Sequence, residues 1–349
     1  MERILVVKLN AIGDVLFATP LVQALRARWP SARIDWLVGR HAAAILDGHP
    51  SVTRTLLYDG PWSASKSAAA VETLALLPRL RAARYDAAFC LHRSRFAGWL
   101  VRCSGARVRV GFRDTPGMSV TAPFDASRHE TERYLDLLRA LGHAVTNPGM
   151  CVGWTPAAAA QAEALLPTSL GPRPWVGLAP GGGRNPGTEM LIKRWPAERC
   201  AELATRVPGT VVVCGSPDEA DLCAQVAAAR PGAVDLCGRT RLAQLPALLA
   251  RLDCCVANDS GPLHIAAAAG TPTVALFGPT DPRLVAPLGP AHVHLWRPPD
   301  CAPCYRPDNA REHRVWHCAR SGDELRCLRD IGVDEVLAAI TAAVAQRRA

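Results

Sequence analysis

Short apolar runs alternate with helical stretches along most of the chain, and this alternation restricts the fold more than any other feature. The first series of runs is RILVVK (3–8), IDWLV (34–38), AAFCL (87–91) and VRVGF (108–112). Strands that alternate with helices pair in parallel, because each helix carries the chain back across the sheet. The sequence therefore predicts an α/β fold with a doubly wound parallel sheet and helices on both faces.

A second series of the same kind follows an interruption rich in proline. Prolines 148, 156, 167, 172 and 174 surround an alanine-rich helical stretch. The alternation resumes with WVGLAP (175–180), VVVCG (211–215), CCVAND (254–259) and PTVALFG (272–278). A chain of 349 residues is long enough for two domains of about 150 residues each. We expect a first domain at 1–165, and a second at 172–349 that ends in a cysteine-containing tail and a helix.

The composition indicates the cellular compartment of the protein and the kind of partner that it binds. The chain is 49% apolar and carries a formal charge of +9, which favours anionic partners. It shows no signal-peptide pattern and no apolar window of about 18 residues that could span a membrane. Its thirteen cysteines include several within apolar runs, which is typical of a reducing compartment. We expect a cytoplasmic protein.

Two common nucleotide motifs are absent. G-x-G-x-x-G follows none of the predicted strands, and G-x-x-x-x-G-K-[ST] does not occur. This argues against a nicotinamide dehydrogenase and against a P-loop ATPase.

An acid stands directly after the first predicted strand, in LNAIGDVLFATP (9–20). Ligands of doubly wound folds bind at the carboxyl ends of the strands, where Gly13 and Asp14 lie. Asp14 could cap the helix that follows. It could also take a proton from an attacking alcohol.

The stretch NDSGPLHIAAAAGTPTVALFGPTDP (258–282) is the densest polar signal. Asp259, Ser260 and Gly261 precede a helix whose backbone N–H groups suit a diphosphate. His264 lies in its first turn, and Thr280 lies in the turn after the next strand. A well-capped core helix is the structural alternative, but two polar turns around one apolar helix favour a ligand site.

Two charged residues and a glycine loop add to the candidate diphosphate site. Lys193, in LIKRWP, is either a solvated surface charge or a group that stabilises a leaving diphosphate. Glu219, in GSPDE, either favours a helix dipole or accepts hydrogen bonds from a ribose diol. Gly182 lies in the loop GGGRNPG after the strand at 175–180.

These motifs resemble, in the same order, those of glycosyltransferase family 9, the ADP-heptose:lipopolysaccharide heptosyltransferases. The segments that carry the resemblance are KLNAIGDVLFATPLVQALR, KRWPAE, GSPDE and the block 258–282, so it spans nearly the whole chain. The resemblance implies a GT-B fold, in which two Rossmann-like domains face each other across a cleft. It also implies an inverting transfer without an obligatory metal, with ADP-heptose bound mainly by the second domain and the lipopolysaccharide inner-core acceptor by the first.

The resemblance also implies roles for individual residues. Asp14 is similar to the catalytic base, Lys193 to the lysine that stabilises the diphosphate and Glu219 to the ribose-binding acid. Asp259, Ser260, Gly261 and His264 match the phosphate-and-sugar turn. Gly13, Gly182 and Thr280 are expected to bind the nucleotide-sugar as well. A lipopolysaccharide acceptor also implies peripheral contact with the inner face of the inner membrane. Two alternatives are a GT-B transferase with another nucleotide-sugar or a protein acceptor such as an autotransporter, and a non-enzymatic binder of anionic polymers.

A one-sided basic stretch lies in the first half of the chain. Nine arginines and a single acid, Asp86, occur between Arg79 and Arg113. Such a stretch favours an acceptor with carboxylate and phosphate groups, and we expect Arg93, Arg95 and Arg113 to bind it. Nucleic acid is a weaker candidate, because aromatic residues for base stacking are sparse here.

The tail contains four cysteines in the pattern C-x2-C-x13-C-x8-C. The pattern, formed by Cys301, Cys304, Cys318 and Cys327, is compatible with a structural zinc or iron site, with His317 as a further ligand. The alternative is reduced cysteines in an ordered tail. No cofactor is expected for catalysis.

Overall fold

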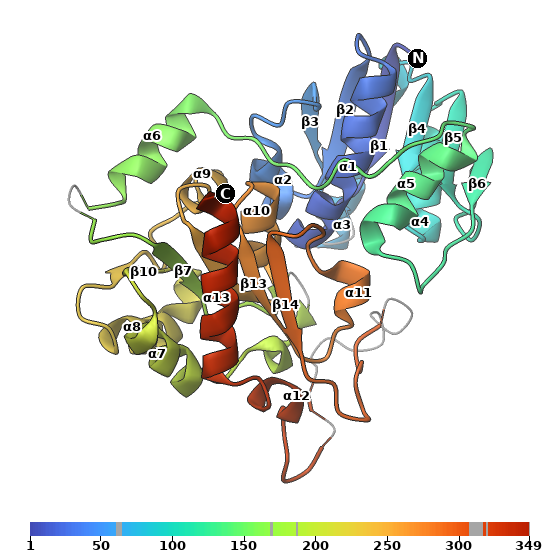
Figure 1. Cartoon of the computed structure of the whole chain (residues 1–349). Coiled ribbons are helices and arrows are strands. Elements are labelled where there is room, and N and C mark those ends of the chain that lie inside the picture. The colour runs from blue at the N-terminus through green and yellow to red at the C-terminus, as the bar shows by residue number, and fades with distance from the viewer. Residues whose placement is uncertain (61–64, 168–169, 186–187, 307–316, 319, 349) are drawn as a thin grey trace. The chain divides into compact units, whose positions relative to one another are not determined.

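The computed structural model describes residues 1–60, 65–167, 170–185, 188–306, 317–318 and 320–348 (Figure 1). The chain divides into two compact units, residues 1–153 and 154–349. Each unit contains a six-stranded sheet in the order expected of a doubly wound fold. The predicted α/β class is confirmed.

The first sheet has the strand order β3-β2-β1-β4-β5-β6, and its neighbouring strands are all parallel. Its strands are β1 (Arg3–Val7), β2 (Arg33–Val38), β3 (Arg54–Leu57), β4 (Ala87–Cys90), β5 (Val108–Phe112) and β6 (Val120–Ala122). The order reverses at β1 and β4, which makes the carboxyl ends of these two strands the place where a ligand is expected.

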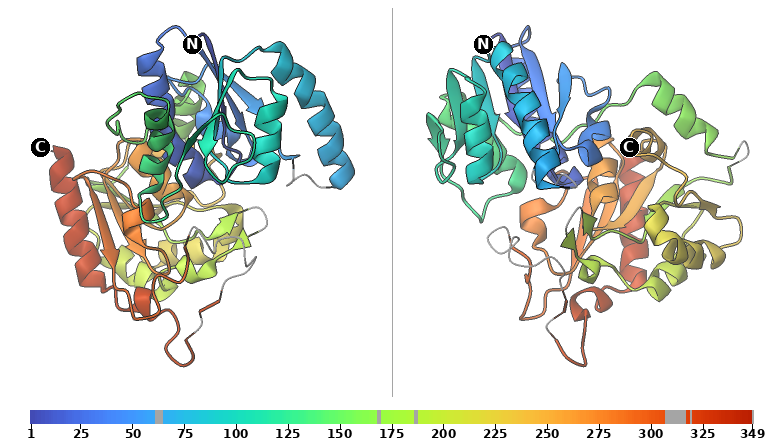
Figure 2. Two further views of the ribbon diagram at one scale, coloured as in Figure 1. Left: turned by 90° about the vertical axis from the view of Figure 1, so that its right-hand side faces the viewer. Right: turned by 180° about the vertical axis from the view of Figure 1, so that it is seen from behind.

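Helices cover both faces of this sheet (Figure 2). They are α1 (Ile12–Arg28), α2 (Arg40–Ala43), α3 (Lys66–Ala82), α4 (Arg95–Cys103) and α5 (Glu130–Ala140). Leu5 and Val7 of β1 pack in one apolar cluster with Leu76 and Leu80 of α3 and with α4. Side chains of a strand alternate between faces, so Ile4 and Val6 point to the opposite face. Helices α1 and α5 contact each other.

The second sheet has the order β11-β10-β7-β12-β13-β14 and is also parallel. Its strands are β7 (Trp175–Ala179), β10 (Thr210–Val213), β11 (Val234–Asp235), β12 (Cys254–Asn258), β13 (Thr273–Phe277) and β14 (His292–Trp296). A small antiparallel pair, β8 (Arg184–Asn185) and β9 (Thr188–Glu189), follows β7.

Eight α-helices of the described residues belong to the second unit. They are α6 (Pro156–Ala164), α7 (Ala197–Arg206), α8 (Ala220–Ala228), α9 (Leu245–Leu249), α10 (Gly261–Ala268), α11 (Pro282–Val285), α12 (Arg326–Arg329) and α13 (Val333–Arg348). The carboxyl-terminal α13 contacts β12, β13 and β14, and Val336, Ile340 and Ala343 are fully buried there. The last helix of the chain is therefore part of the core of this unit.

The division between the units falls inside the proline-rich stretch, after Gly153. We expected residues 154–165 in the first domain, but α6 is attached to the second unit. Gln244 donates to Gln161 at 2.9 Å, and Arg251 lies 3.2 Å from Glu163.

None of the helices in the described part of the chain is both long and apolar enough to cross a membrane.

Candidate active site

Asp14 lies at the carboxyl edge of the first sheet, in the first turn of α1. The capping interpretation is wrong, since Ala11 occupies the N-cap position and no side chain caps this helix. Instead, Asp14 Oδ2 lies 2.8 Å from Lys8 Nζ. The Asp14 side chain is 43% exposed whereas that of Lys8 is 6% exposed. The carboxylate is therefore held by a buried cation and remains accessible to a ligand.

Lys8 is a site residue that the sequence reasoning missed. Its ammonium also lies 5.3 Å from the centre of the Tyr134 ring, and its carbonyl accepts a hydrogen bond from Trp36 Nε1 at 3.2 Å. A lysine at the end of the apolar run RILVVK, next to a glycine–aspartate turn, was the available signal. Burial of a long side chain at a strand end is not visible in the sequence alone.

Helix α5 adds a buried network beside this ion pair. The Tyr134 hydroxyl and the Arg133 guanidinium both donate to Glu130. Burial, together with the negative charges of Glu130 and Asp14, raises the pKa of Tyr134 well above its ordinary value. Tyr134 therefore stays protonated and packs as a neutral ring against Lys8.

The predicted acceptor-binding arginines lie at the same edge of the sheet. Arg93 follows β4, Arg113 follows β5, and Arg95 is the first residue of α4. Arg95 and Arg113 are exposed, while the Arg93 guanidinium lies 3.6 Å from the Phe124 ring centre and 3.4 Å from Asp114. The Leu9 N–H donates to His92 Nε2 at 2.9 Å, which ties the ends of β1 and β4 together. Gly13 lies in the first turn of α1, so the first unit gathers its candidates at one edge.

In the second unit, Asp259 follows β12 and is paired with Lys193. The Lys193 Nζ–Asp259 Oδ2 distance is 2.6 Å, and their side chains are 12% and 6% exposed. His264 Nε2 lies 3.5 Å from the other carboxylate oxygen. Burial alone would raise the pKa of Asp259, but the Lys193 ammonium and the His264 hydrogen bond outweigh it and hold that pKa far below its usual range. Lys193 is thus a buried partner of an ionised acid and not a solvated surface charge.

A glycine loop passes between Glu219 and Ser260. Gly182 has φ of +107°, which other residues rarely adopt, and a Cβ there would lie 2.5 Å from Ser260 Cβ. A Cβ at Gly181 would lie 2.0 Å from Glu219 Oε1. Close approach of this loop to Glu219 therefore requires glycine at 181, and its close approach to Ser260 requires glycine at 182.

Glu219 does more than favour a helix dipole. Its carboxylate accepts hydrogen bonds from the Gly182 N–H at 2.5 Å, the Ser216 N–H at 2.9 Å and Arg194 Nη2 at 3.2 Å. The Arg194 side chain also donates to the Gly182 carbonyl at 2.9 Å. The sequence predicted Glu219 but gave no indication that Arg194 joins it in holding the loop.

The first turn of α10 offers backbone N–H groups without a side-chain cap. Ser260 is the N-cap residue, but its hydroxyl donates to the Asn258 carbonyl at 3.1 Å, and α10 begins at Gly261. Thr280, after β13, is 4% exposed, and its hydroxyl oxygen has no hydrogen-bond partner among the described residues. Both features leave donors that a bound ligand could use.

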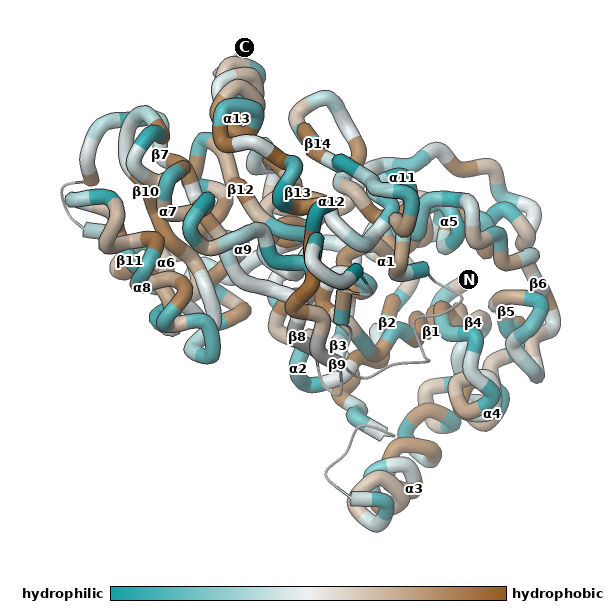
Figure 3. Tube along the Cα trace, turned by 90° about the horizontal axis from the view of Figure 1, so that it is seen from below, coloured by the Kyte–Doolittle hydropathy of each residue, from teal (hydrophilic) through white to brown (hydrophobic). Residues whose placement is uncertain are grey.

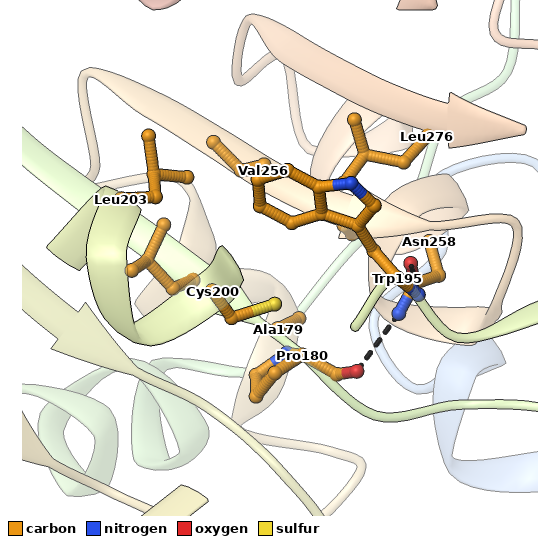
Figure 4. A pocket seen from close by; sticks show the side chains of 10 residues that line it. Ala179, Pro180, Trp195, Cys200, Leu203, Val256, Asn258 and Leu276 are labelled. Atoms are coloured by element: carbon orange, nitrogen blue, oxygen red, sulfur yellow. Dashed lines mark hydrogen bonds between the residues drawn. The ribbon is translucent and has the colours of Figure 1, made fainter. Parts of the chain in front are cut away.

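Asn258 holds the strand ends together beneath this site, and sequence reasoning missed it. Its Nδ2 donates to the carbonyls of Pro180 at 2.8 Å and Gly181 at 2.9 Å, and its Oδ1 accepts from the Trp195 N–H at 2.9 Å. Figure 4 shows Asn258 at the edge of a cavity of about 10 Å³, which has room for one water. A cavity of this size is too small for a nucleotide or a sugar.

The cysteine tail reaches back to this edge. Thr280 forms a β-bridge with Tyr305, and the Tyr305 ring centre lies 4.8 Å from Lys193 Nζ. Cys304 Sγ donates to the Cys301 carbonyl at 3.2 Å, and the Leu325 N–H donates to Cys318 Sγ at 3.4 Å.

The four thiols differ in exposure, from the exposed Cys301 to the buried Cys327. Burial and the neighbouring thiols of the tail raise the pKa of Cys327 to about 11. No group of three or more potential ligands that could hold a metal occurs in the described ranges, which omit 307–316 and 319. The structure thus does not show the predicted metal site among the described residues, and that site stays a prediction.

Comparison with known proteins identifies the family. Residues 73–314 match the profile of Glycosyltransferase family 9 (heptosyltransferase). The chain is 27% identical to lipopolysaccharide heptosyltransferase 1 of Pseudomonas aeruginosa over 331 residues, covering 87% of this chain and 86% of that protein. It is 29% identical to lipopolysaccharide heptosyltransferase 2 of Salmonella typhimurium over 306 residues, covering 82% and 85%.

A solved structure agrees with these relatives along the full length. The structure of ADP-heptose lipopolysaccharide heptosyltransferase II from Escherichia coli is 25% identical, covers 100% of both chains and superimposes with a TM-score of 0.78. The match supports a GT-B fold. Together with the family match, it excludes the alternative that the chain is a non-enzymatic binder of anionic polymers. This chain belongs to glycosyltransferase family 9 and is a glycosyltransferase of the heptosyltransferase group.

Proposed function

We propose that this enzyme transfers heptose from ADP-heptose to the inner core of lipopolysaccharide, with inversion at the anomeric carbon. The support comes from relatives named lipopolysaccharide heptosyltransferases and from a similarly folded E. coli heptosyltransferase solved with ADP-2-deoxy-2-fluoro heptose. The single observation that carries the chemistry is the accessible Asp14 carboxylate beside the buried Lys8 ammonium.

Asp14 is the proposed general base. The acceptor hydroxyl oxygen forms a bond to the anomeric carbon while the bond between that carbon and the ADP oxygen breaks. The hydroxyl proton passes to Asp14, and the electron pair of the broken bond leaves with ADP. Attack from the face opposite the leaving group gives inversion in one step, and no metal takes part.

The second unit binds the donor in this proposal. Lys193 lies beside Asp259 and His264 and stabilises the negative charge of the departing diphosphate. The uncapped start of α10, with Ser260 and Gly261, donates backbone N–H groups to the phosphates. Three further residues bind the donor in this proposal. They are Gly182, Glu219, which binds the ribose, and Thr280, whose buried hydroxyl has no hydrogen-bond partner in the described chain.

The first unit binds the acceptor. Arg93, Arg95 and Arg113 lie at the carboxyl edge that also holds Asp14, so they pair with carboxylate or phosphate groups of the acceptor while its hydroxyl meets the base. Because lipopolysaccharide precursors are anchored in a membrane, the enzyme works at the inner face of the inner membrane.

We also propose that Cys301, Cys304, Cys318 and Cys327 bind a structural zinc or iron. The support is the spacing of the cysteines. The Leu325 N–H that donates to Cys318 Sγ would also be available to a metal-bound sulfur. Metal analysis of the purified protein tests this. One metal per chain that is absent from the C301S/C304S variant is the expected result, and a metal-free active enzyme would reject it.

Transfer itself is tested with ADP-heptose and truncated lipopolysaccharides of defined core length. Mass spectrometry should find one added heptose on one acceptor and none on the others. UDP- and GDP-sugars, and an autotransporter protein as acceptor, are the controls. Transfer with one of these and not with ADP-heptose and lipopolysaccharide would replace the proposal by the corresponding alternative.

A further inference from the structure

The outer side of α3 is apolar, although it is in contact with solvent. Val71 is 68% exposed and Leu74 is 69% exposed, and Ala68, Ala70 and Ala75 are exposed beside them. On the neighbouring α4, Trp99 is 43% exposed. Most exposed surface on a helix of this kind carries charged or polar side chains, so an apolar outer face indicates a partner.

The exposed apolar side of α3 is not the side that packs on the sheet. The inner side of α3 is already occupied, since Leu76 and Leu80 are buried against the sheet. Helices α3 and α4 pack together (Figure 3). Arg81 Nε donates to the Cys103 carbonyl at 3.0 Å, and the Trp99 ring centre lies 5.7 Å from that of Phe96. The exposed side chains therefore belong to two helices that are packed in the unit.

The charged residues around these apolar side chains are mostly basic. Exposed basic residues of the two helices are Lys66, Arg79, Arg81, Arg95 and Arg102. The single acid within α3 and α4, Glu72, lies 2.5 Å from Arg40 and accepts the Gly60 N–H at 3.0 Å. Lys66, Arg79, Arg81, Arg95 and Arg102 pair with no acid among the residues that the structure describes. Apolar side chains among such cations match a bilayer with anionic headgroups better than they match a protein surface.

The apolar face of α3 and α4 lies near the edge of the sheet that holds Asp14. Helices α1, α3 and α4 each follow a strand of the parallel sheet, so all three begin at the edge where Asp14 lies. At about 1.5 Å per residue, Val71 lies roughly 8 Å from the start of α3 and Trp99 roughly 6 Å from the start of α4. The apolar side chains are thus near the catalytic edge of the unit and not at its far end.

We propose that the outer face of α3 and α4, with Val71, Leu74 and Trp99 at its centre, binds an anionic lipid bilayer. Binding would present the Asp14 edge to an acceptor anchored in the same bilayer. That consequence rests on the proposed function, whereas the lipid binding itself does not.

The full-length enzyme is tested by co-sedimentation with vesicles of phosphatidylglycerol and phosphatidylethanolamine, and with vesicles of phosphatidylcholine alone. We expect binding to the anionic vesicles that weakens as salt is raised, and little binding to phosphatidylcholine. In V71S/L74S/W99S the partition coefficient should fall at least about tenfold, since burial of one large apolar side chain is worth that much. L74E alone is the second variant, because it changes one largely exposed position and preserves the packed Trp99.

Leu288, which is 51% exposed on the second unit, provides the matched control. L288S should bind vesicles as the unchanged enzyme does. Transfer to a delipidated core oligosaccharide should be the same for the unchanged enzyme and for L74E, so failure of the lipid proposal is distinguishable from failure of the proposed function. Equal vesicle binding by all variants would overturn the proposal. So would a dimer in gel filtration that L74E converts to a monomer, because the face would then bind a second copy.

Discussion

The buried ammonium of Lys8 lies 2.8 Å from the half-exposed carboxylate of Asp14, and the two residues come from the end of β1 and the start of α1. A charge pair with one buried partner fixes the direction of the exposed partner. Lys8 is thus a positioning residue for the proposed base, and its contribution can be separated from that of Asp14.

Replacement of Asp14 by asparagine keeps the shape of the side chain and removes its ability to take a proton. We expect kcat to fall by about 10² to 10⁴, with ADP affinity unchanged because the proposed donor site is in the other unit. Steady-state kinetics and calorimetric titration of ADP check this. A variant with near-normal kcat would reject Asp14 as the base.

Replacement of Lys8 by methionine removes the cation but fills a similar volume. The Asp14 carboxylate would lose its orientation, so kcat should fall about tenfold or more while KM for ADP-heptose stays the same. K66M, at an exposed lysine of the same unit, is the control. An unchanged kcat in K8M, with a lowered melting temperature, would show that Lys8 serves only stability.

Replacement of Lys193 by methionine should weaken ADP binding and lower kcat. It also leaves the buried Asp259 carboxylate without its cation, at a cost of about 3–5 kcal/mol in the free energy of unfolding. The double variant K193M/D259N removes that uncompensated charge and should recover much of the stability but none of the activity. Recovery of both would mean that the pair is structural.

Acid should destabilise the enzyme in two separate windows. Burial lowers the pKa of His49 and of His292 to about 4 in the folded state, so only the unfolded chain takes up protons there between about pH 6.5 and 4. Stability should therefore fall as the pH drops through that window. The folded-state pKa of Asp259 is depressed, so its contribution is present above about pH 4 and is lost below it. Thermal melts from pH 7 to 3 check this. D259N should flatten only the lower part of the curve.

Gly181 offers a steric test of the donor loop. In G181A the new Cβ would meet the Glu219 carboxylate, so the loop has to shift and ADP affinity should fall by about tenfold or more. Gly332 has open space around its Cα and no left-handed backbone, so G332A is the control. Unaltered ADP affinity in G181A would exclude the loop from nucleotide binding.

The fold was predictable from the sequence because parallel strands buried on both faces form continuous apolar runs, as RILVVK and VVVCG do. The candidate residues at strand ends, such as Asp14 and Asp259, were also predictable, since the position after a strand is local information. Lys8, Arg194 and Asn258 were missed for one reason. Each acts through a partner distant in sequence or on another element, and pairing of that kind depends on the register of the sheet.

Tyr305 follows Cys304 directly and its ring lies against Lys193, so the cysteine-rich tail and the donor-binding edge are mechanically joined. Metal loading, oxidation or alkylation of Cys304 would act on the residue next to that ring. If Lys193 binds the diphosphate as proposed, nucleotide affinity should depend on the thiol state of the tail.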